Sequence, residues 1–159
     1  FLDFGLYKRM APEAVELELA CQREVAEDDA ERLHELLAGS GFLPHPEKAD
    51  PDAVMSYVLD SIWWYTVDEE VQLTPEIATR VAIEASDMRS SHFREMRHQD
   101  IRPEHLFGRR MEMLTLAVLS QLRARANWHR IAREWMYGEP PVTELGRAEA
   151  EFYARGAAV

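Results

Sequence analysis

Apolar side chains recur every three or four residues along nearly the whole of this 159-residue chain, and glycine and proline fall mainly between such stretches. A repeat of this kind places apolar side chains on one face of a helix, whereas Gly and Pro interrupt helices. The pattern therefore predicts an all-α fold. With 47% apolar and 30% charged residues, the chain has the composition of one ordinary globular domain with a single core. We expect a multi-helix bundle.

Capping residues predict where the first helices begin and end. Pro12 stands at a first helical position with acidic residues after it, and it opens the first helix. Asp28 or Asp29 can cap the second helix through its carboxylate. Gly39 or Gly41 can end that helix, because glycine tolerates the left-handed backbone of a helix C-terminus.

The same signals predict the later helices, over 52–67, 75–88, 103–125, 127–138 and 143–156. The helix over 103–125 carries the most apolar stripe in the chain, so we expect it at the centre of the core. The residues of that stripe are Leu106, Phe107, Met113, Leu114, Ala117, Val118 and Leu122.

The first residues depart from the helical pattern. Residues 1–6, FLDFGL, form a short apolar run broken by Asp3 and Gly5, which predicts a strand end that leads into a loop. We therefore expect one domain over residues 1–159. Residues 1–10 would form the short strand remnant and loop, and residues 11–159 would form the helices.

Charge and cysteine content exclude several classes of function. The chain has 18 Lys and Arg against 29 Asp and Glu, a net charge of −11, so we expect no nucleic-acid partner. Cys21 alone can form neither an internal disulfide nor a thiolate zinc site, which favours a reducing, cytoplasmic location. No apolar run approaches the roughly 18 residues of a transmembrane helix. Because the chain opens on Phe1 with no targeting pattern, we expect a piece of a longer protein.

The tripeptide Asp3-Phe4-Gly5 is the first candidate for chemistry. After a strand in protein kinases, this tripeptide places its carboxylate on Mg²⁺ that bridges the nucleotide phosphates. The phenylalanine packs beneath, and the glycine permits the turn. The alternative is an ordinary loop in which Asp3 caps a nearby backbone group.

The surrounding sequence favours the kinase interpretation. Four segments resemble the AarF/UbiB family of atypical, protein-kinase-like proteins. They are residues 1–10 (FLDFGLYKRM), 28–44 (beginning DDAERLHELL and ending GFLP), 103–111 (PEHLFGRRM) and 126–135 (ANWHRIAREW). The resemblance spans most of the chain, although only the Asp-Phe-Gly segment is a chemical motif. It implies that the bundle is the helical C-terminal lobe of a kinase-like fold.

The resemblance also implies a function. The intact parent would bind ATP and Mg²⁺ and act as a small-molecule kinase or an ATPase linked to isoprenoid quinone (ubiquinone-type) biosynthesis. Asp3 would be the Mg²⁺ ligand, with Phe4 and Gly5 as its positioning neighbours. The family's N-lobe and catalytic loop would lie upstream of Phe1, so this chain would contain no catalytic residue and would be inactive by itself.

The implied partners follow from the same resemblance. They are the N-lobe of the same protein, proteins of the quinone pathway, and membrane lipids. A lipid partner would place the cytoplasmic protein at the surface of the inner membrane. The alternative function is a stand-alone helical module that binds a protein or a lipid without catalysis.

A metal centre is a second candidate site. Glu31 with His34 and Glu95 with His98 form two Glu-x-x-His pairs, the pattern of a di-iron carboxylate site in helical bundles. However, helix geometry turns both pairs away from the neighbouring apolar faces. We interpret them as solvated pairs. The remaining histidines, His45, His92, His105 and His129, are expected to be surface or partly buried structural residues.

Arginine and tryptophan supply the last candidates. The basic cluster comprises Arg109, Arg110, Arg123, Arg125, Arg130 and Arg133. It could meet phospholipid head groups or an acidic partner; the favoured interpretation pairs Arg109 and Arg110 with Glu104 and Glu112. The four tryptophans are Trp63, Trp64, Trp128 and Trp135. They could line an apolar ligand groove, but we favour the core for them, with one of the adjacent pair exposed.

Overall fold

The computed structural model describes residues 9–89 and 97–156, and within these ranges it is mostly helical. The seven α-helices are α1 (Pro12–Ala26), α2 (Ala30–Ser40), α3 (Pro51–Ile62), α4 (Pro75–Ser86), α6 (Pro103–Gln121), α7 (Trp128–Met136) and α8 (Glu144–Gly156). Two single-turn 3₁₀ helices, η1 (Pro46–Lys48) and η2 (Trp63–Tyr65), flank α3. The helical prediction is confirmed at this level.

A short strand pair, which the sequence did not predict, joins two distant parts of the chain. Strand β1 (Val71–Gln72) pairs antiparallel with β2 (Arg125–Ala126), with Val71 opposite Ala126. Because β2 occupies Arg125–Ala126, the helix expected over 103–125 ends earlier, at Gln121. Arg123 has a positive φ of 50°, and the chain then turns into β2.

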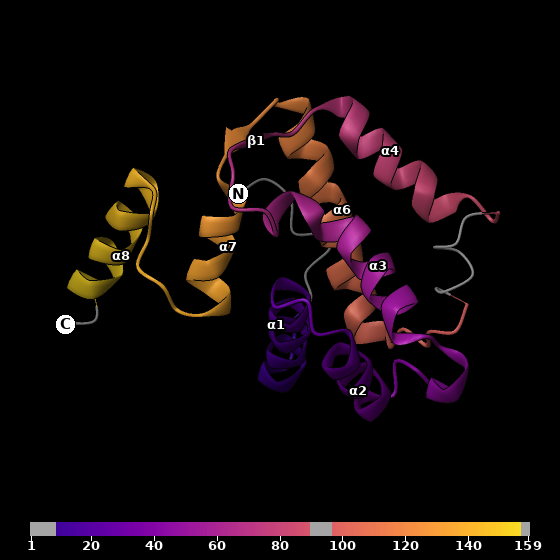
Figure 1. Ribbon diagram of the computed structural model, residues 1–159. Helices are drawn as coiled ribbons and strands as arrows, with labels where there is room; N and C mark the ends of the chain where they lie inside the picture. Colours follow the sequence, from indigo (N-terminus) through magenta and orange to yellow (C-terminus); the bar gives the residue numbers. More distant parts are fainter. Residues whose placement is uncertain (1–8, 90–96, 157–159) are drawn as a thin grey trace.

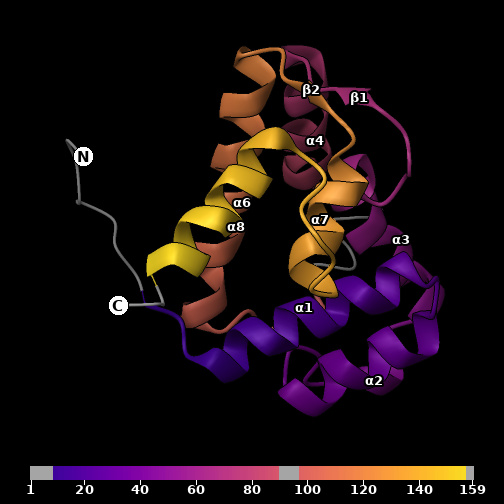
Figure 2. The same ribbon diagram turned by 90° about the vertical axis from the view of Figure 1, so that its left-hand side faces the viewer.

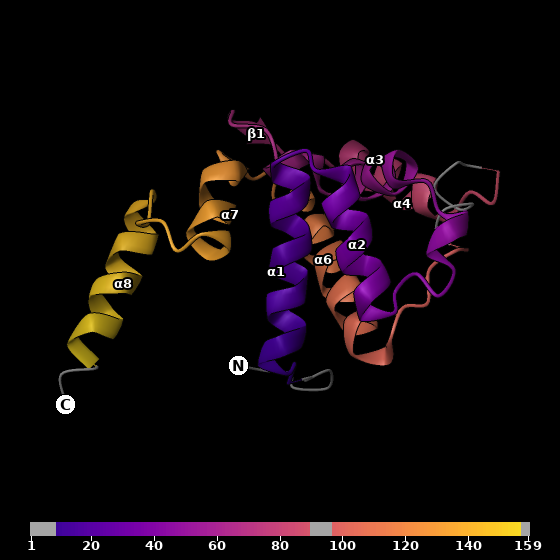
Figure 3. The same ribbon diagram turned by 60° about the horizontal axis from the view of Figure 1, so that its bottom comes forward.

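The helices form a packed body from which one helix stands apart. Helix α2 packs against both α1 and α3, and α4 packs along α6 (Figure 1). Helices α1 and α2 lie side by side with α6 behind them in the tilted view (Figure 3). Helix α7 contacts η2 and α1, whereas α8 lies away from the packed helices (Figures 1 and 3).

Local caps explain where several helices begin and end. The Asp29 carboxylate accepts a hydrogen bond from the Arg32 backbone N–H at 2.9 Å, so Asp29 rather than Asp28 caps α2. At the other end, Gly41 has a φ of 84°, so Gly41 rather than Gly39 ends the helix. Asn127 caps α7 in the same way, because its side chain accepts a hydrogen bond from the Arg130 N–H at 3.0 Å.

The hydrophobic core lies between α1, α2, α3, β1 and one face of α6. Its most deeply buried apolar side chains are Leu33, Leu43, Leu73 and Val54. Phe42 and Leu43, which follow α2, are both buried as well. Helix α6 contributes Leu116 to this core.

The prediction for the apolar stripe of α6 is wrong. Leu114 is 53% exposed and Val118 is 58% exposed, and Leu106, Phe107, Met113 and Leu122 are exposed as well. The helix instead buries the opposite face, which carries His105, Leu116 and Ser120. His105 and Arg109 on that side of α6 both contact Glu18 of α1, and a helical wheel contains no information about such long-range contacts.

None of the helices in the described ranges is both long enough and apolar enough to cross a membrane.

Candidate functional site

A chain of polar side chains connects three elements of the core. Glu18 of α1 accepts two contacts at 2.7 Å, from His105 Nδ1 through Oε1 and from Arg109 Nη2 through Oε2. Arg109 Nη1 also donates to Glu112 Oε2 at 3.2 Å, and the Tyr65 hydroxyl of η2 donates to Glu112 Oε1 at 3.2 Å. We call these five residues, Glu18, Tyr65, His105, Arg109 and Glu112, the polar network.

Helix periodicity places three members of the polar network on one face of α6. His105, Arg109 and Glu112 are spaced four and three residues apart, so their side chains project in nearly the same direction. Leu116 follows four residues later on the same face and enters the apolar core. The network therefore extends the core of the domain toward the start of α6.

The two ends of the polar network are deeply buried. His105 is only 2% exposed, and its ring lies edge-on to Phe42 with centroids 4.7 Å apart. The Tyr65 side chain is also buried. Burial, and then the negative charge of Glu112, raises the pKa of Tyr65 far above its ordinary range, so this hydroxyl is a permanent hydrogen-bond donor.

The guanidinium of Arg109 is the positive centre of the polar network. Burial lowers the pKa of Arg109, but Glu18 and Glu112 outweigh that effect, and the pKa is raised. Both carboxylates thus remain paired with a permanent cation. Since both oxygens of Glu18 are already engaged, the arrangement can hold α1 against α6 and leaves Glu18 poorly placed to act on a substrate.

Cys21 lies one helical turn after Glu18 on α1 and is half-buried against the core. Burial, followed by the nearby charge of Glu18, raises the pKa of the Cys21 thiol to about 11. The thiol is therefore protonated near neutral pH, and a thiolate is the form that reacts as a nucleophile. Cys21 is therefore a packing residue rather than a nucleophile.

The exposed side of α6 forms an open apolar groove of about 390 Å³. Its lining includes Phe107, Met111, Leu114 and Val118, and Arg110 provides the charge in it. The groove lies on the opposite face of the helix from the polar network. We call it the α6 groove.

The residues expected to hold Mg²⁺ and ATP are not among those that the structure describes. Asp3, Phe4 and Gly5 lie outside residues 9–89 and 97–156. Their assignment remains a prediction from the sequence. Glu104 belongs to α6, but its side chain is outside the described part, so its expected pairing stays untested.

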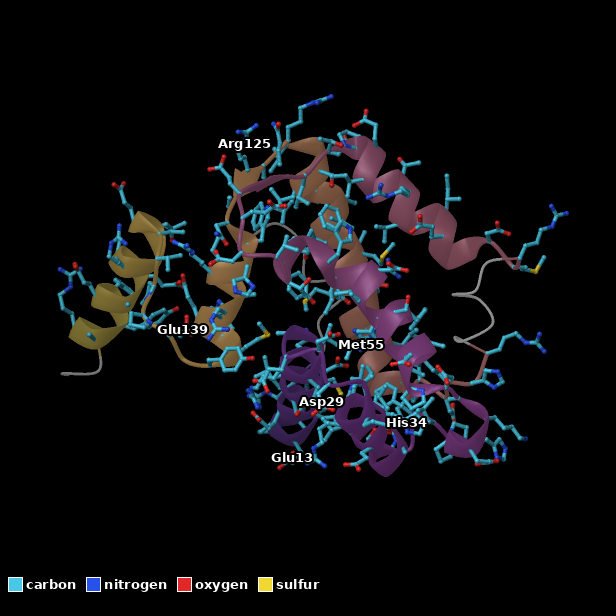
Figure 4. All side chains as sticks on the ribbon, in the orientation of Figure 1. Glu13, Asp29, His34, Met55, Arg125 and Glu139 are labelled. Carbon is cyan, nitrogen blue, oxygen red and sulfur yellow. The ribbon has the colours of Figure 1, made fainter. Side chains whose placement is uncertain are left out.

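The structure describes Glu31, His34 and His98 of the two Glu-x-x-His pairs. His34 lies on α2 (Figure 4). Its Nε2 is 3.1 Å from the Pro46 carbonyl oxygen, and Glu31 is exposed. Glu95 falls outside the described ranges. Among the residues that are described, no three His, Cys, Asp or Glu side chains are grouped to hold a metal ion.

Most members of the basic cluster form separate ion pairs. Arg109 pairs with Glu112, as expected. The other pairs are Arg125 with Glu70 at 3.1 Å, Arg130 with Asp68 at 2.8 Å and Arg133 Nε with Glu139 at 2.8 Å. Figure 4 shows Arg125 and Glu139 at well separated places on the molecule. These pairings support the structural interpretation of the cluster over a single lipid-binding patch.

The tryptophans have different environments. Trp64 is buried and meets Trp128 edge-on at 5.7 Å, and Trp128 Nε1 donates to the Val71 carbonyl at 2.8 Å. Trp63 is half-buried beneath Arg80. Trp135 is 73% exposed, so the core interpretation is confirmed for Trp64 and wrong for Trp135.

No family model, no curated protein and no solved structure matches this chain.

The sequence contained a signal for the polar network that hydrophobic periodicity missed. His105 was expected to be a surface or partly buried residue, yet it is among the most buried polar side chains described. The signal was the alignment of His105, Arg109 and Glu112 with Leu116 on one helical face. Glu18 and Tyr65 gave no local signal, since only the fold brings them to α6.

Proposed function

We propose that this chain is the helical C-terminal part of an AarF/UbiB-like atypical kinase or ATPase linked to isoprenoid quinone biosynthesis. Asp3 would be a ligand of Mg²⁺ bound to ATP, and Phe4 and Gly5 would position it. The N-lobe and the catalytic loop of the parent would supply the other ligands and the reacting groups. The helices described above would brace that site.

One observation carries this proposal. The segments that resemble the family contain many of the residues that build the domain. Residues 28–44 include the buried Leu33, Phe42 and Leu43, and residues 103–111 include the buried His105. A resemblance confined to exposed positions would be weak support, because surface residues tolerate change. A resemblance in core and network residues supports a shared framework.

The chemistry of Mg²⁺ explains why this chain would need the rest of the parent protein to bind Mg·ATP. Mg²⁺ keeps several waters and is bound through a few carboxylates together with substrate phosphates. One carboxylate therefore cannot retain Mg·ATP usefully. We expect the chain by itself to lack ATP turnover, whereas the parent protein with its N-lobe would have it.

Replacement of Asp3 in the parent protein tests the assignment. Asp3→Asn removes a metal-ligating charge with little change of volume, so we expect Mg²⁺-dependent ATP turnover to fall by about 100-fold or more while folding is retained. The control is Asp28→Asn, because Asp28 is exposed and has a φ of 58° that asparagine also tolerates. Unchanged turnover in the Asp3 variant would refute the role of Asp3.

A second function is favoured by a different observation. The α6 groove leaves Leu114 and Val118 more than half exposed, and exposed apolar grooves commonly bind a helix or a lipid. A stand-alone helical module that binds a protein or lipid without catalysis would use this surface. This function would gain support if the parent protein bound no Mg·ATP.

A further inference from the structure

Helix α8 has an apolar face without a partner in the described structure. Leu145 is 80% exposed and Phe152 is 65% exposed. With Ala148 between them, they follow the i, i+3, i+7 spacing that puts side chains on one side of a helix. The helix has 13 residues. An isolated helix of about this length is only marginally stable in water, so α8 needs a packing surface.

The α6 groove is an exposed apolar surface that could pack against the apolar face of α8. Phe107, Met111, Leu114 and Val118 are spaced by four, three and four residues, which makes a continuous seam along one side of α6. Seams with this spacing accept the apolar face of a second helix. The seam is exposed at each of these four residues.

Charge on the two surfaces is also complementary. Arg110 is the charged residue in the lining of the α6 groove, and the other lining residues are apolar except Thr115. Helix α8 carries Glu149 and Glu151, which border its apolar stripe on either side. A docked α8 would bring one of these carboxylates toward the guanidinium of Arg110.

Among the described residues, the connection between α7 and α8 forms its hydrogen bonds at the start of α8. Glu134 of α7 accepts a hydrogen bond from the Val142 backbone N–H at 2.9 Å, and Thr143 Oγ1 accepts one from Gly146 N–H at 2.9 Å. Gly138 after α7 has a positive φ of 69°, a conformation that glycine adopts without strain. Figure 2 shows α8 and α6 on the same side of α7, whereas Figure 1 shows α7 between them, so docking requires α8 to swing about this connection.

We propose that α8 is a strap that closes onto the α6 groove of its own chain. In the closed state Leu145, Ala148 and Phe152 pack into the seam of α6, and the two exposed apolar faces cover each other. In the open state, the α6 groove is available to another apolar helix. The strap would thus control access to this surface whether or not the chain belongs to a kinase.

Hydrogen exchange of the α8 amides tests whether the helix docks. We expect these amides to exchange at least 10-fold more slowly in the unmodified chain than in Phe152→Asp, which would also bind more of a fluorescent hydrophobic dye. The matched control is Ala154→Asp, which adds the same charge on the opposite face of α8. It should leave exchange close to that of the unmodified chain. Equal and fast exchange of α8 in all three proteins would overturn the strap.

Crosslinking identifies the occupant of the α6 groove. In a Cys21→Ala background, Arg110→Cys with Glu149→Cys should be joined by a short bis-maleimide within a single chain at low protein concentration. The yield should exceed that of Arg110→Cys with Ala154→Cys by at least fivefold. Products formed only between two chains would overturn the strap in favour of a second copy, and equal yields of the two pairs would overturn docking on this face.

Discussion

His105 shows how one side chain can link two helices and the core. Its ring contacts Glu18 at 2.7 Å and lies against Phe42, in a position that is almost closed to solvent. We expect His105→Ala to lower the free energy of unfolding by about 2–4 kcal/mol, because it leaves a cavity and removes a hydrogen bond to a charged group. Urea denaturation measures this change.

The control for that prediction is His45→Ala. The His45 side chain is mostly exposed, and its Nδ1 lies 3.7 Å from the exposed carboxylate of Glu47. We expect a change within about 0.5 kcal/mol. If both alanine variants lost equally little stability, the polar network would not be holding α1 against α6.

Cys21 provides a pH-dependent prediction. Because burial raises the pKa of its thiol to about 11, alkylation by iodoacetamide at pH 8 should be about 100-fold slower than for an exposed thiol. The folded protein holds this proton more tightly than the unfolded chain does. The stability that Cys21 contributes is therefore complete below the ordinary thiol pKa, and it is lost as the pH rises toward 11.

Cys21→Ala distinguishes that contribution from other alkaline effects. The fall in the free energy of unfolding between pH 8.5 and 11 should be smaller in Cys21→Ala than in the unmodified chain. Rapid alkylation of Cys21 in the native protein at pH 8 would contradict the burial described here.

At the scale of single elements, α2 has the most completely defined ends. The Asp29 cap satisfies a backbone N–H that would otherwise lack a partner at the helix start. We expect Asp29→Ala to lower the free energy of unfolding by about 1 kcal/mol. Asp28→Ala is not a suitable control because Asp28 has a positive φ. Asp52→Asn serves instead, because Asp52 is exposed in the first turn of α3 and Asp50, not Asp52, caps that helix. A loss no larger than that of Asp52→Asn would contradict the capping role.

The sequence predicted helix ends better than helix faces, and the reason is physical. The caps at Asp29 and Asn127 act within four residues of their own positions, so the local sequence contains the information. The orientation of α6 depends on Glu18 and Tyr65, which lie far away along the chain. The strand pair joins segments more than fifty residues apart, which a local pattern cannot reveal.

At the scale of the whole molecule, an ion pair joins the segment before β1 to α7. Hydrogen bonds from Arg130 and from Asn127 lower the pKa of Asp68. This stabilisation is present above the ordinary carboxyl pKa of about 4, and it is lost as the pH falls through the lower pKa of the folded state. We therefore expect the stability of the fold to decline below pH 4.

Asp68→Asn tests this contribution in an acid titration followed by circular dichroism. The variant keeps the size of the side chain but loses its titration, so the decline of its stability with falling pH should be shallower. Identical pH dependence in the two proteins would show that the pair of Asp68 and Arg130 contributes nothing to acid sensitivity.

The residues predicted to form the nucleotide site lie outside the helices that the structure describes. The Asp-Phe-Gly motif and its sequence context suggested Asp3 as a Mg²⁺ ligand, but Asp3 lies outside the described residues. The polar network could not be predicted as a unit, because its members come from α1, η2 and α6. Local sequence thus suggested the chemistry, while the fold determined which polar residues support the helices.

Calorimetric titration of Mg·ATP tests the central claim most directly. The titration would be made into this chain and, in parallel, into the parent protein that includes an N-lobe and a catalytic loop. We expect binding by the parent, loss of that binding in its Asp3→Asn variant, and no binding by this chain alone. Absence of binding by both proteins would contradict the kinase-like assignment and favour the helical binding module.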